Sequence, residues 1–275
     1  MQKSGVLIVM KRDIELVKEF YEKTAKEYDK DYETPYWKLY HEITWENIKQ
    51  FLPRRRDGLI LDAGGGTGYW AIRLAKHGYR VVVTDISENM LKVAKKKIKT
   101  EKLHCKIRTE VADIRDMPSF TSNHFDMALA EGDPVSYCLN PEKAIRELAR
   151  VVKPKAPVVV SVDSKYSMMS RLVAEGSFDQ LSRFIDTGII KSREGEFELR
   201  AFAPEELKIL FEKCGLKLLI IIGKPILAQL LPRERRDELI VKDFERLLDL
   251  ELRFNSIPSL VGVGGHLEAV GTKRE

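Results

Sequence analysis

The chain has 275 residues, of which 44% are hydrophobic and 32% are charged. This balance excludes a disordered or fibrous chain, and the length excludes a small scaffold that depends on disulfides. The most apolar run, residues 216–223, is far shorter than the ~20 residues that a membrane helix needs, so we expect no membrane span.

The charge and cysteine patterns point away from several other classes. The 47 Lys and Arg against 42 Asp and Glu give a formal net charge of +5, and the basic residues lie in mixed-sign segments, so nucleic-acid binding is not predicted. Cys105, Cys138 and Cys214 are far apart and form no C-x-x-C pair, and the five histidines show no ligand spacing. We therefore predict neither disulfides nor a metal site. Residues 5–10 are too short for a signal-peptide core, so we expect a cytoplasmic location.

From residue 59 onward, short apolar runs alternate with helix-like segments, which is typical of a parallel sheet with helices on both faces. The strands are expected at residues 59–61, 80–84, 106–111, 125–130, 158–162, 216–222 and 266–272. The helices are expected at residues 68–77, 87–99, 141–152 and 203–214, and residues 224–265 are expected to be helical and polar, including residues 233–253. The last two strands lack the short crossover of the earlier ones, so the final strand should insert antiparallel beside its predecessor.

The predicted fold class is therefore α/β, a doubly wound, seven-stranded, mostly parallel sheet with an antiparallel last strand and helical lid insertions. The core that binds a cofactor should comprise residues 54–163, 202–223 and 264–275. Residues 1–53 should form an N-terminal helical lid. Residues 164–201 and 224–263 should form insertions that cap the substrate.

The first strand runs into a glycine-rich turn, residues 61–68, which read Leu-Asp-Ala-Gly-Gly-Gly-Thr-Gly. Glycine permits positive φ there and lets a ligand lie against bare backbone. Asp85 follows Gly66 by 19 residues at the end of the second strand, where a carboxylate can accept hydrogen bonds from both ribose hydroxyls of a nucleotide-like ligand. Asp62, before the glycines, disfavours a pyrophosphate and suits a cationic ligand. Residues 66–71 also fit the looser G-x-G-x-x-A fingerprint, so a nicotinamide-dependent oxidoreductase is the alternative.

The stretches 62–68 and 85–91 resemble the motifs of class I S-adenosylmethionine-dependent methyltransferases, of the small-molecule type. The likeness covers roughly residues 15–162 and the terminal strand pair, and residues 111–114, 117–118 with 125–126, and 131–133 extend it. The resemblance implies S-adenosylmethionine as the cofactor and methyl transfer by in-line displacement as the reaction.

The resemblance and the residue chemistry together give a set of cofactor-binding candidates. Gly64 and Gly66 should lie near the amino-acid end of the cofactor, Asp113 should accept from the adenine edge, and Ile86 with Met90 should pack on the purine. The alternatives are that Asp113 only caps a turn and that Met90 is ordinary helix core. The full set is Asp62, Gly64, Gly65, Gly66, Asp85, Ile86, Met90, Asp113, Ile114, Glu131 and Tyr28.

Residues 21–32 resemble the N-terminal lid helix of small-molecule methyltransferases, in which an aromatic residue often covers the cofactor. An aromatic face beside a sulfonium gains about 1–2 kcal/mol of cation–π attraction when desolvated. Tyr28 is the first candidate for this role, and Tyr21, Tyr36 and Trp37 are further candidates.

The loop after the fourth strand bears on the acceptor. Residues 131–137 read Glu-Gly-Asp-Pro-Val-Ser-Tyr and lack the second proline and adjacent aromatic of the amino-methylases that act on nucleic acids and proteins, so a small metabolite is the expected acceptor. Asp133 is the one candidate for positioning a substrate or taking its proton, although Pro134 after it also fits a structural role. His266 is expected to be structural.

A non-catalytic partner subunit is the third functional alternative. The methylated atom and the oligomeric state stay open.

Overall fold

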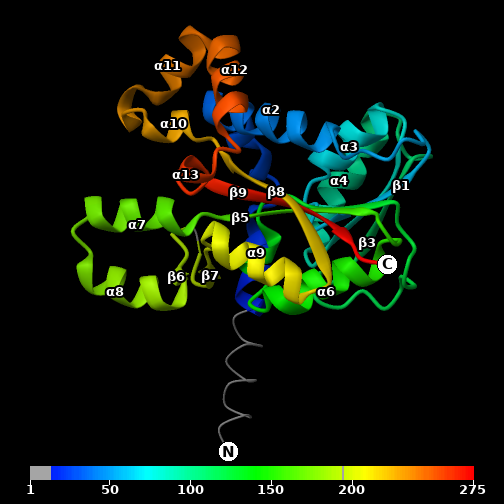
Figure 1. The fold of residues 1–275 in the computed structure, drawn as a ribbon. Helices are drawn as coiled ribbons and strands as arrows, with labels where there is room; N and C mark the ends of the chain where they lie inside the picture. Colours follow the sequence, from blue (N-terminus) through cyan, green and yellow to red (C-terminus); the bar gives the residue numbers. More distant parts are fainter. Residues whose placement is uncertain (1–13, 194) are drawn as a thin grey trace, which may run out of the picture.

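The computed structural model describes residues 14–193 and 195–275, and a seven-stranded sheet runs through its centre (Figure 1). Its strand order is β3-β2-β1-β4-β5-β9-β8. The strands are β1 Leu59–Ala63, β2 Arg80–Asp85, β3 Ile107–Val111, β4 Met127–Ala130, β5 Pro157–Asp163, β8 Leu216–Lys224 and β9 His266–Lys273. Each of the seven strands lies where the alternating pattern predicts it, within a few residues at either end.

The strand directions confirm the predicted fold class. β1 pairs in parallel with β2 and β4, β2 with β3, and β4 with β5. β9 lies between β5 and β8 and is antiparallel to both. This arrangement brings the carboxyl ends of the parallel strands to one edge of the sheet, the edge at which α/β proteins bind their ligands.

Helices cover both faces of the sheet, as predicted (Figure 1). One face packs against α2 Pro35–Lys49, α3 Tyr69–Lys76 and α4 Glu88–Thr100, and the other against α5 Pro134–Tyr137, α6 Pro141–Val151 and α9 Pro204–Lys213. Trp45, Trp70 and Leu91 are buried on the first face, whereas Leu148 and Phe211 are buried on the second. Burial of such large side chains on both faces holds the sheet rigid beneath its ligand-binding edge.

Two helical insertions interrupt the alternation. After β5 come α7 Lys165–Ala174, α8 Phe178–Thr187 and the hairpin of β6 Ile189–Lys191 with β7 Glu198–Arg200. Between β8 and β9 come α10 Leu227–Leu230, the 3-10 helix η2 Arg233–Arg235, α11 Arg236–Lys242, α12 Phe244–Phe254 and α13 Pro258–Val261. Figure 1 shows α10, α11 and α12 grouped beside α2, against which α11 and α12 pack. None of the helices in the described residues combines the length and the apolar character of a membrane span.

The helices differ from the prediction in two places. The stretch predicted to be helical over residues 224–265, including 233–253, is broken at Asp243, whose φ of −151° and ψ of 57° cannot continue a helix, so α11 ends before α12 begins. At the N-terminus, the described helix covers residues 14–24 and gives way to a turn and then to the 3-10 helix η1 Tyr28–Glu33. The expected lid helix over residues 21–32 therefore does not form as one element. The part of the predicted lid at residues 1–13 lies outside the described residues.

Candidate functional site

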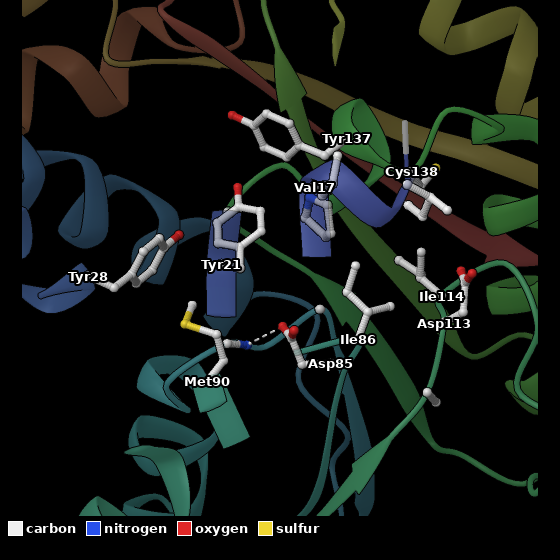
Figure 2. A pocket seen from close by; sticks show the side chains of 16 residues that line it. Val17, Tyr21, Tyr28, Asp85, Ile86, Met90, Asp113, Ile114, Tyr137 and Cys138 are labelled. Carbon is white, nitrogen blue, oxygen red and sulfur yellow. Dashed lines mark hydrogen bonds between the residues drawn. The ribbon is translucent and has the colours of Figure 1, made fainter. Parts of the chain in front are cut away.

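The first cavity at the carboxyl edge of the sheet has a free volume of about 70 Å³, and we call it the glycine cleft (Figure 2). Most of its wall comes from the loops after β1, β2, β3 and β4, and the rest from the segment before α2. The lining residues are Ile14, Val17, Tyr21, Tyr28, Gly64, Gly66, Asp85, Ile86, Met90, Ala112, Asp113, Ile114, Gly132, Pro134, Tyr137 and Cys138.

The glycine turn keeps one wall of this cleft free of side chains. Gly64 and Gly66 have φ of +69° and +53°, values that side chains disfavour. A Cβ at Gly64 would lie 2.6 Å from the Cβ of Pro134, and one at Gly66 would lie 3.0 Å from the terminal methyl of Met90. The chain therefore needs glycine at both positions, and a ligand there meets backbone.

Asp85, at the end of β2, points into the cleft and is held by the backbone (Figure 2). Its two carboxylate oxygens accept hydrogen bonds from the amides of Gly66, at 3.0 Å, and Ser87, at 2.8 Å. Burial raises the pKa of Asp85 to about 6, and the two amide donors limit that rise. Each oxygen keeps a further lone pair, so the carboxylate can also accept hydrogen bonds from a ligand.

Asp62 and Gly65 do not line the cleft but lie beneath it. Asp62 is fully buried, and one of its oxygens accepts from the amide of Ala71 at 3.1 Å. A Cβ on Gly65 would lie 2.6 Å from the Asp62 carboxylate, so this glycine makes room for the acid. Burial raises the pKa of Asp62 to about 7. Asp62 and Gly65 therefore support the glycine turn from beneath and do not contact the space in the cleft.

The remaining cleft candidates are brought together on its walls. Ile86 and Met90 follow Asp85, and Asp113 with Ile114 follows β3 (Figure 2). Asp113 also forms an ion pair with Arg115, with oxygen and nitrogen 2.6 Å apart, which fixes the direction of its carboxylate. Tyr28 closes the opposite side from η1.

Contacts between the N-terminal segment and the core hold that closing side in place. Glu22 accepts hydrogen bonds from the amides of Glu88, at 2.7 Å, and Asn89, at 3.2 Å, at the start of α4. Asp29 accepts from the Thr67 hydroxyl at 2.6 Å and from Lys97 at 2.8 Å. An acid at a helix N-terminus is favourable, but nothing in the local pattern near residue 22 indicates this long-range partner.

A bare glycine turn, an acid after β2 and a second acid after β3 are the features that an adenosyl ligand needs, and comparison with known proteins agrees. Residues 60–155, about a third of the chain, match the family model described as a methyltransferase domain. The chain is 21% identical over 251 residues to the tRNA 5-carboxymethoxyuridine methyltransferase of Escherichia coli K12, covering 88% of this chain and 91% of that protein. It is 37% identical over 105 residues to the mitochondrial 2-methoxy-6-polyprenyl-1,4-benzoquinol methylase of Caenorhabditis elegans, covering 36% of each chain.

Comparison with solved structures shows that the fold is also found in methyltransferases. A solved structure of S-adenosylmethionine-dependent methyltransferases from Methanosarcina mazei superposes with a TM-score of 0.60 at 21% identity, covering 83% of this chain and 97% of that one. The chain thus carries a methyltransferase domain over residues 60–155, on a fold that it shares with S-adenosylmethionine-dependent methyltransferases. Of the two predicted enzyme classes, these likenesses support the methyltransferase.

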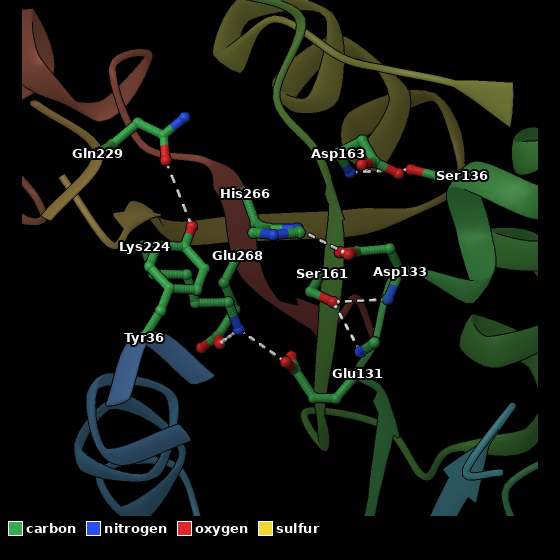
Figure 3. Close-up of polar contacts among 11 residues, drawn as sticks. Tyr36, Glu131, Asp133, Ser136, Ser161, Asp163, Lys224, Gln229, His266 and Glu268 are labelled. Atoms are coloured by element: carbon green, nitrogen blue, oxygen red, sulfur yellow. Dashed lines mark hydrogen bonds and ion pairs between the residues drawn. The ribbon is translucent and has the colours of Figure 1, made fainter. Parts of the chain in front are cut away.

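Glu131, predicted at the cofactor, lies instead in a buried ion cluster outside the cleft lining (Figure 3). Lys224 Nζ lies 2.7 Å from the Glu131 carboxylate and also contacts Glu268, which Asn47 contacts in turn. Burial would lower the pKa of Lys224, but the two carboxylates outweigh it and raise that pKa. Burial and the charge of Glu268 raise the pKa of Glu131. The cluster ties β4 to β8 and β9, a connection that the sequence did not reveal.

A second cavity, with a free volume of about 550 Å³, adjoins the glycine cleft, and we call it the aromatic cavity. Tyr21, Tyr28, Gly132 and Tyr137 line both cavities, so the two meet at these residues. The residues that line it are Phe20, Tyr21, Thr24, Glu27, Tyr28, Asp31, Tyr32, Trp37, Tyr40, His41, Trp70, Gly132, Asp133, Tyr137, Asp163 and His266. Of the further aromatic candidates, Tyr21 and Trp37 therefore line a cavity, whereas Tyr36 lines neither and packs in the core beside α11.

Three ionisable residues gather at one side of the aromatic cavity, and we call them the acid cluster (Figure 3). His266 Nδ1 lies 2.7 Å from Asp133 Oδ2, and ligand atoms of Asp133, Asp163 and His266 lie within 4.8 Å of one another. The sequence predicted no metal, yet this group is compact enough to surround one small cation or one ligand atom. Ser161 Oγ accepts from the amides of Gly132 and Asp133, both at 3.0 Å, and so holds the loop after β4.

The acid cluster is electrostatically asymmetric. Burial would raise the pKa of Asp133, but the charge and hydrogen bond of His266 hold it below its usual range. Burial would lower the pKa of His266, but Asp133 raises it. Burial and the neighbouring Asp133 raise the pKa of Asp163 to about 7. Asp133 and His266 thus form an ion pair, beside which Asp163 retains a carboxyl group that titrates near neutral pH.

Proposed function

We propose that this methyltransferase transfers the methyl group of S-adenosylmethionine to a small molecule bound in the aromatic cavity. The observation that carries the proposal is the junction of the two cavities at Tyr21, Tyr28, Gly132 and Tyr137. A ligand in the glycine cleft and a ligand in the aromatic cavity would meet there without crossing solvent. The bound cofactor supplies an activated methyl group on a sulfonium.

The cleft residues fit this cofactor in a definite orientation. We assign the ribose hydroxyls to Asp85, whose carboxylate is fixed by two backbone amides and keeps free lone pairs. We assign the adenine amino group to Asp113, on the wall after β3, and the purine face to Ile86 and Met90. The amino-acid end then lies along the bare backbone at Gly64 and Gly66. Tyr28 lies at the junction, where an aromatic face would stabilise a sulfonium.

The contribution of this chain to catalysis is mainly orientation. Transfer of a methyl group from a sulfonium requires the attacking atom to lie in line with the bond that breaks, and alignment alone can contribute roughly 7–11 kcal/mol in favourable cases. The rigid sheet edge and the hydrogen bonds that Glu22 and Asp29 accept hold the walls of both cavities. The predicted cap segments, residues 164–201 and 224–263, complete the proposal as covers of the acceptor side.

A small molecule fits the aromatic cavity better than RNA does. The E. coli relative acts, by its name, on tRNA and the C. elegans relative on a benzoquinol, so relatives alone do not choose. The described lining residues of the aromatic cavity include four carboxylic acids and no Lys or Arg. An RNA backbone beside this cavity would meet like charge, whereas RNA binding draws its affinity from Lys and Arg on phosphates.

The proposal is tested by following the labelled methyl group. The protein is incubated with methyl-tritiated S-adenosylmethionine and either the small-molecule fraction or the RNA fraction of one microbial extract. We expect label in a product that passes an ultrafiltration membrane, and loss of that product in the Asp85→Ala variant. Label on RNA would contradict the proposed acceptor, and no transfer to either fraction would favour the non-catalytic partner subunit.

A further inference from the structure

We propose that the acceptor of this methyltransferase is an amine, whose nitrogen binds at the acid cluster of Asp133, Asp163 and His266. The inference rests on the proposed function, since it names the chemical class that the aromatic cavity accepts. Three independent features of the cavity support it: its charge, its aromatic walls, and two carboxylate oxygens without a hydrogen-bond partner.

The charge of the cavity favours a cation. Its acids are Glu27, Asp31, Asp133 and Asp163, and among the described lining residues only the histidines can oppose them. Burial lowers the pKa of His41 to about 3, so that ring is neutral at pH 7. The positive charge of His266 is cancelled by its own partner Asp133. Glu27 pairs with Lys30, which does not line the cavity. Within the described part of the chain, Asp31 and Asp163 therefore remain without an ion pair, and a carboxylate or phosphate ligand would be repelled.

The nearest buried cation does not alter this balance. Lys224 Nζ lies 4.7 Å from the centre of the Tyr40 ring, is fully buried and does not line the cavity. Its charge is already taken up by Glu131 and Glu268. An anionic ligand in the cavity would therefore gain no ion pair from it.

The aromatic walls favour the same ligand class. Rings of Tyr21, Tyr28, Tyr32, Trp37 and Tyr40 line the cavity, and several stand edge to face against one another. Tyrosine and tryptophan faces attract ammonium groups through the negative charge of the ring face, and several rings around one cation form an aromatic cage. A neutral apolar acceptor would need the rings but not the acids.

Two carboxylate oxygens of the acid cluster have no hydrogen-bond donor. Asp133 Oδ1 and Asp163 Oδ2 are buried and have no hydrogen-bond partner, and the two residues are 3% and 7% exposed. A buried acceptor without a donor is destabilising, so such oxygens are normally satisfied by a ligand or water. An amine or ammonium group brings up to three N–H donors on one atom, whereas a phenol brings one and a carboxylate none. Asp133 directly follows Gly132, which lines both cavities, so this nitrogen would lie next to the junction. For methyl transfer an ammonium acceptor first gives one proton to the carboxylate of Asp163. Its lone pair then forms the N–C bond as the C–S bond of the sulfonium breaks, and S-adenosylhomocysteine leaves.

The test compares three ligands of similar shape and different charge. The protein is saturated with S-adenosylhomocysteine and titrated calorimetrically at pH 7 with 2-phenylethylamine, 3-phenylpropanoate and 2-phenylethanol. We expect the amine to bind at least about tenfold more tightly than the acid or the alcohol, as one charge-assisted hydrogen bond provides. Asp163→Asn and Asp133→Asn should each remove most of that preference while affinity for S-adenosylhomocysteine stays the same.

A matched control separates the acid cluster from the general charge of the cavity. Glu27→Gln removes one acid of the same cavity that is exposed to solvent, and it should change the preference for the amine by less than about twofold. Equal binding of the three ligands, tighter binding of the acid, binding of none, or an amine preference that survives both Asn variants would overturn the assignment. Failure to bind S-adenosylhomocysteine would instead count against the proposed function, so the two failures are distinguishable.

Discussion

Replacing Asp85 with alanine tests the proposed ribose contact most sharply. The carboxylate is 8% exposed and held by the amides of Gly66 and Ser87, so its position changes little between the free and the bound protein. A hydrogen bond to a charged group contributes about 1.5–3 kcal/mol. The two ribose hydroxyls would share a carboxylate that already accepts hydrogen bonds from two backbone amides. We therefore count one such contribution for the two hydroxyls together. Asp85→Ala should therefore weaken binding of S-adenosylhomocysteine by roughly 10- to 150-fold.

Isothermal titration calorimetry measures this change directly, with thermal unfolding as the check that the variant folds. Glu88→Gln is the matched control, because it removes an exposed acid three residues away that does not line the cleft. We expect its dissociation constant to stay within about twofold of the wild type. An Asp85→Ala variant that folds and binds as tightly as the control would refute the ribose assignment.

Three further predictions concern the cleft and the core. The Asp85 carboxylate accepts hydrogen bonds from ribose hydroxyls best when it is ionised, and its pKa is raised to about 6. Affinity for S-adenosylhomocysteine should therefore fall about tenfold between pH 7 and pH 5. Calorimetry of Asp85→Ala should show a weaker dependence of affinity on pH. Gly64→Ala should destabilise the protein by about 1–3 kcal/mol more than Gly176→Ala, since both have φ of +69° but only Gly64 has a neighbour within 4 Å of its Cβ; equal urea midpoints would contradict this. Lys224→Met should lower the free energy of unfolding by about 3–5 kcal/mol because it leaves two buried carboxylates unpaired, whereas the exposed Lys155→Met should change it by under about 1 kcal/mol. Similar losses in the two lysine variants would show that the buried pair contributes no more than a surface one.

The sheet and the glycine cleft could be predicted from the sequence because their signals are local. An apolar strand, a glycine turn and an acid 19 residues later lie within one strand-helix-strand unit, and the fold brings Gly66 and Asp85 into direct contact. The antiparallel last strand followed from the missing crossover. Asp62 and Gly65, from the same motif, turned out to shape the turn from below, because burial of one acid under a glycine leaves no trace in the spacing.

The aromatic cavity could not be predicted because its parts come from distant segments. Asp133 and His266 meet across 133 residues, and Glu131 meets Lys224 across 93. No local sequence pattern near one residue indicates its distant partner. Asp133 was therefore predicted as an isolated candidate and His266 as a structural histidine. The break at Asp243 was missed for a different reason: hydrophobic periodicity continues through it, while the backbone does not.

The measurement that bears most directly on the whole account is a crystal structure of the protein with S-adenosylhomocysteine. We predict the ribose hydroxyls within about 2.7 Å of the Asp85 oxygens and the sulfur at the junction beside Tyr28, open toward the aromatic cavity. A nucleoside bound away from Asp85, or a sulfur that faces solvent with the aromatic cavity closed off behind it, would contradict the arrangement of two joined cavities.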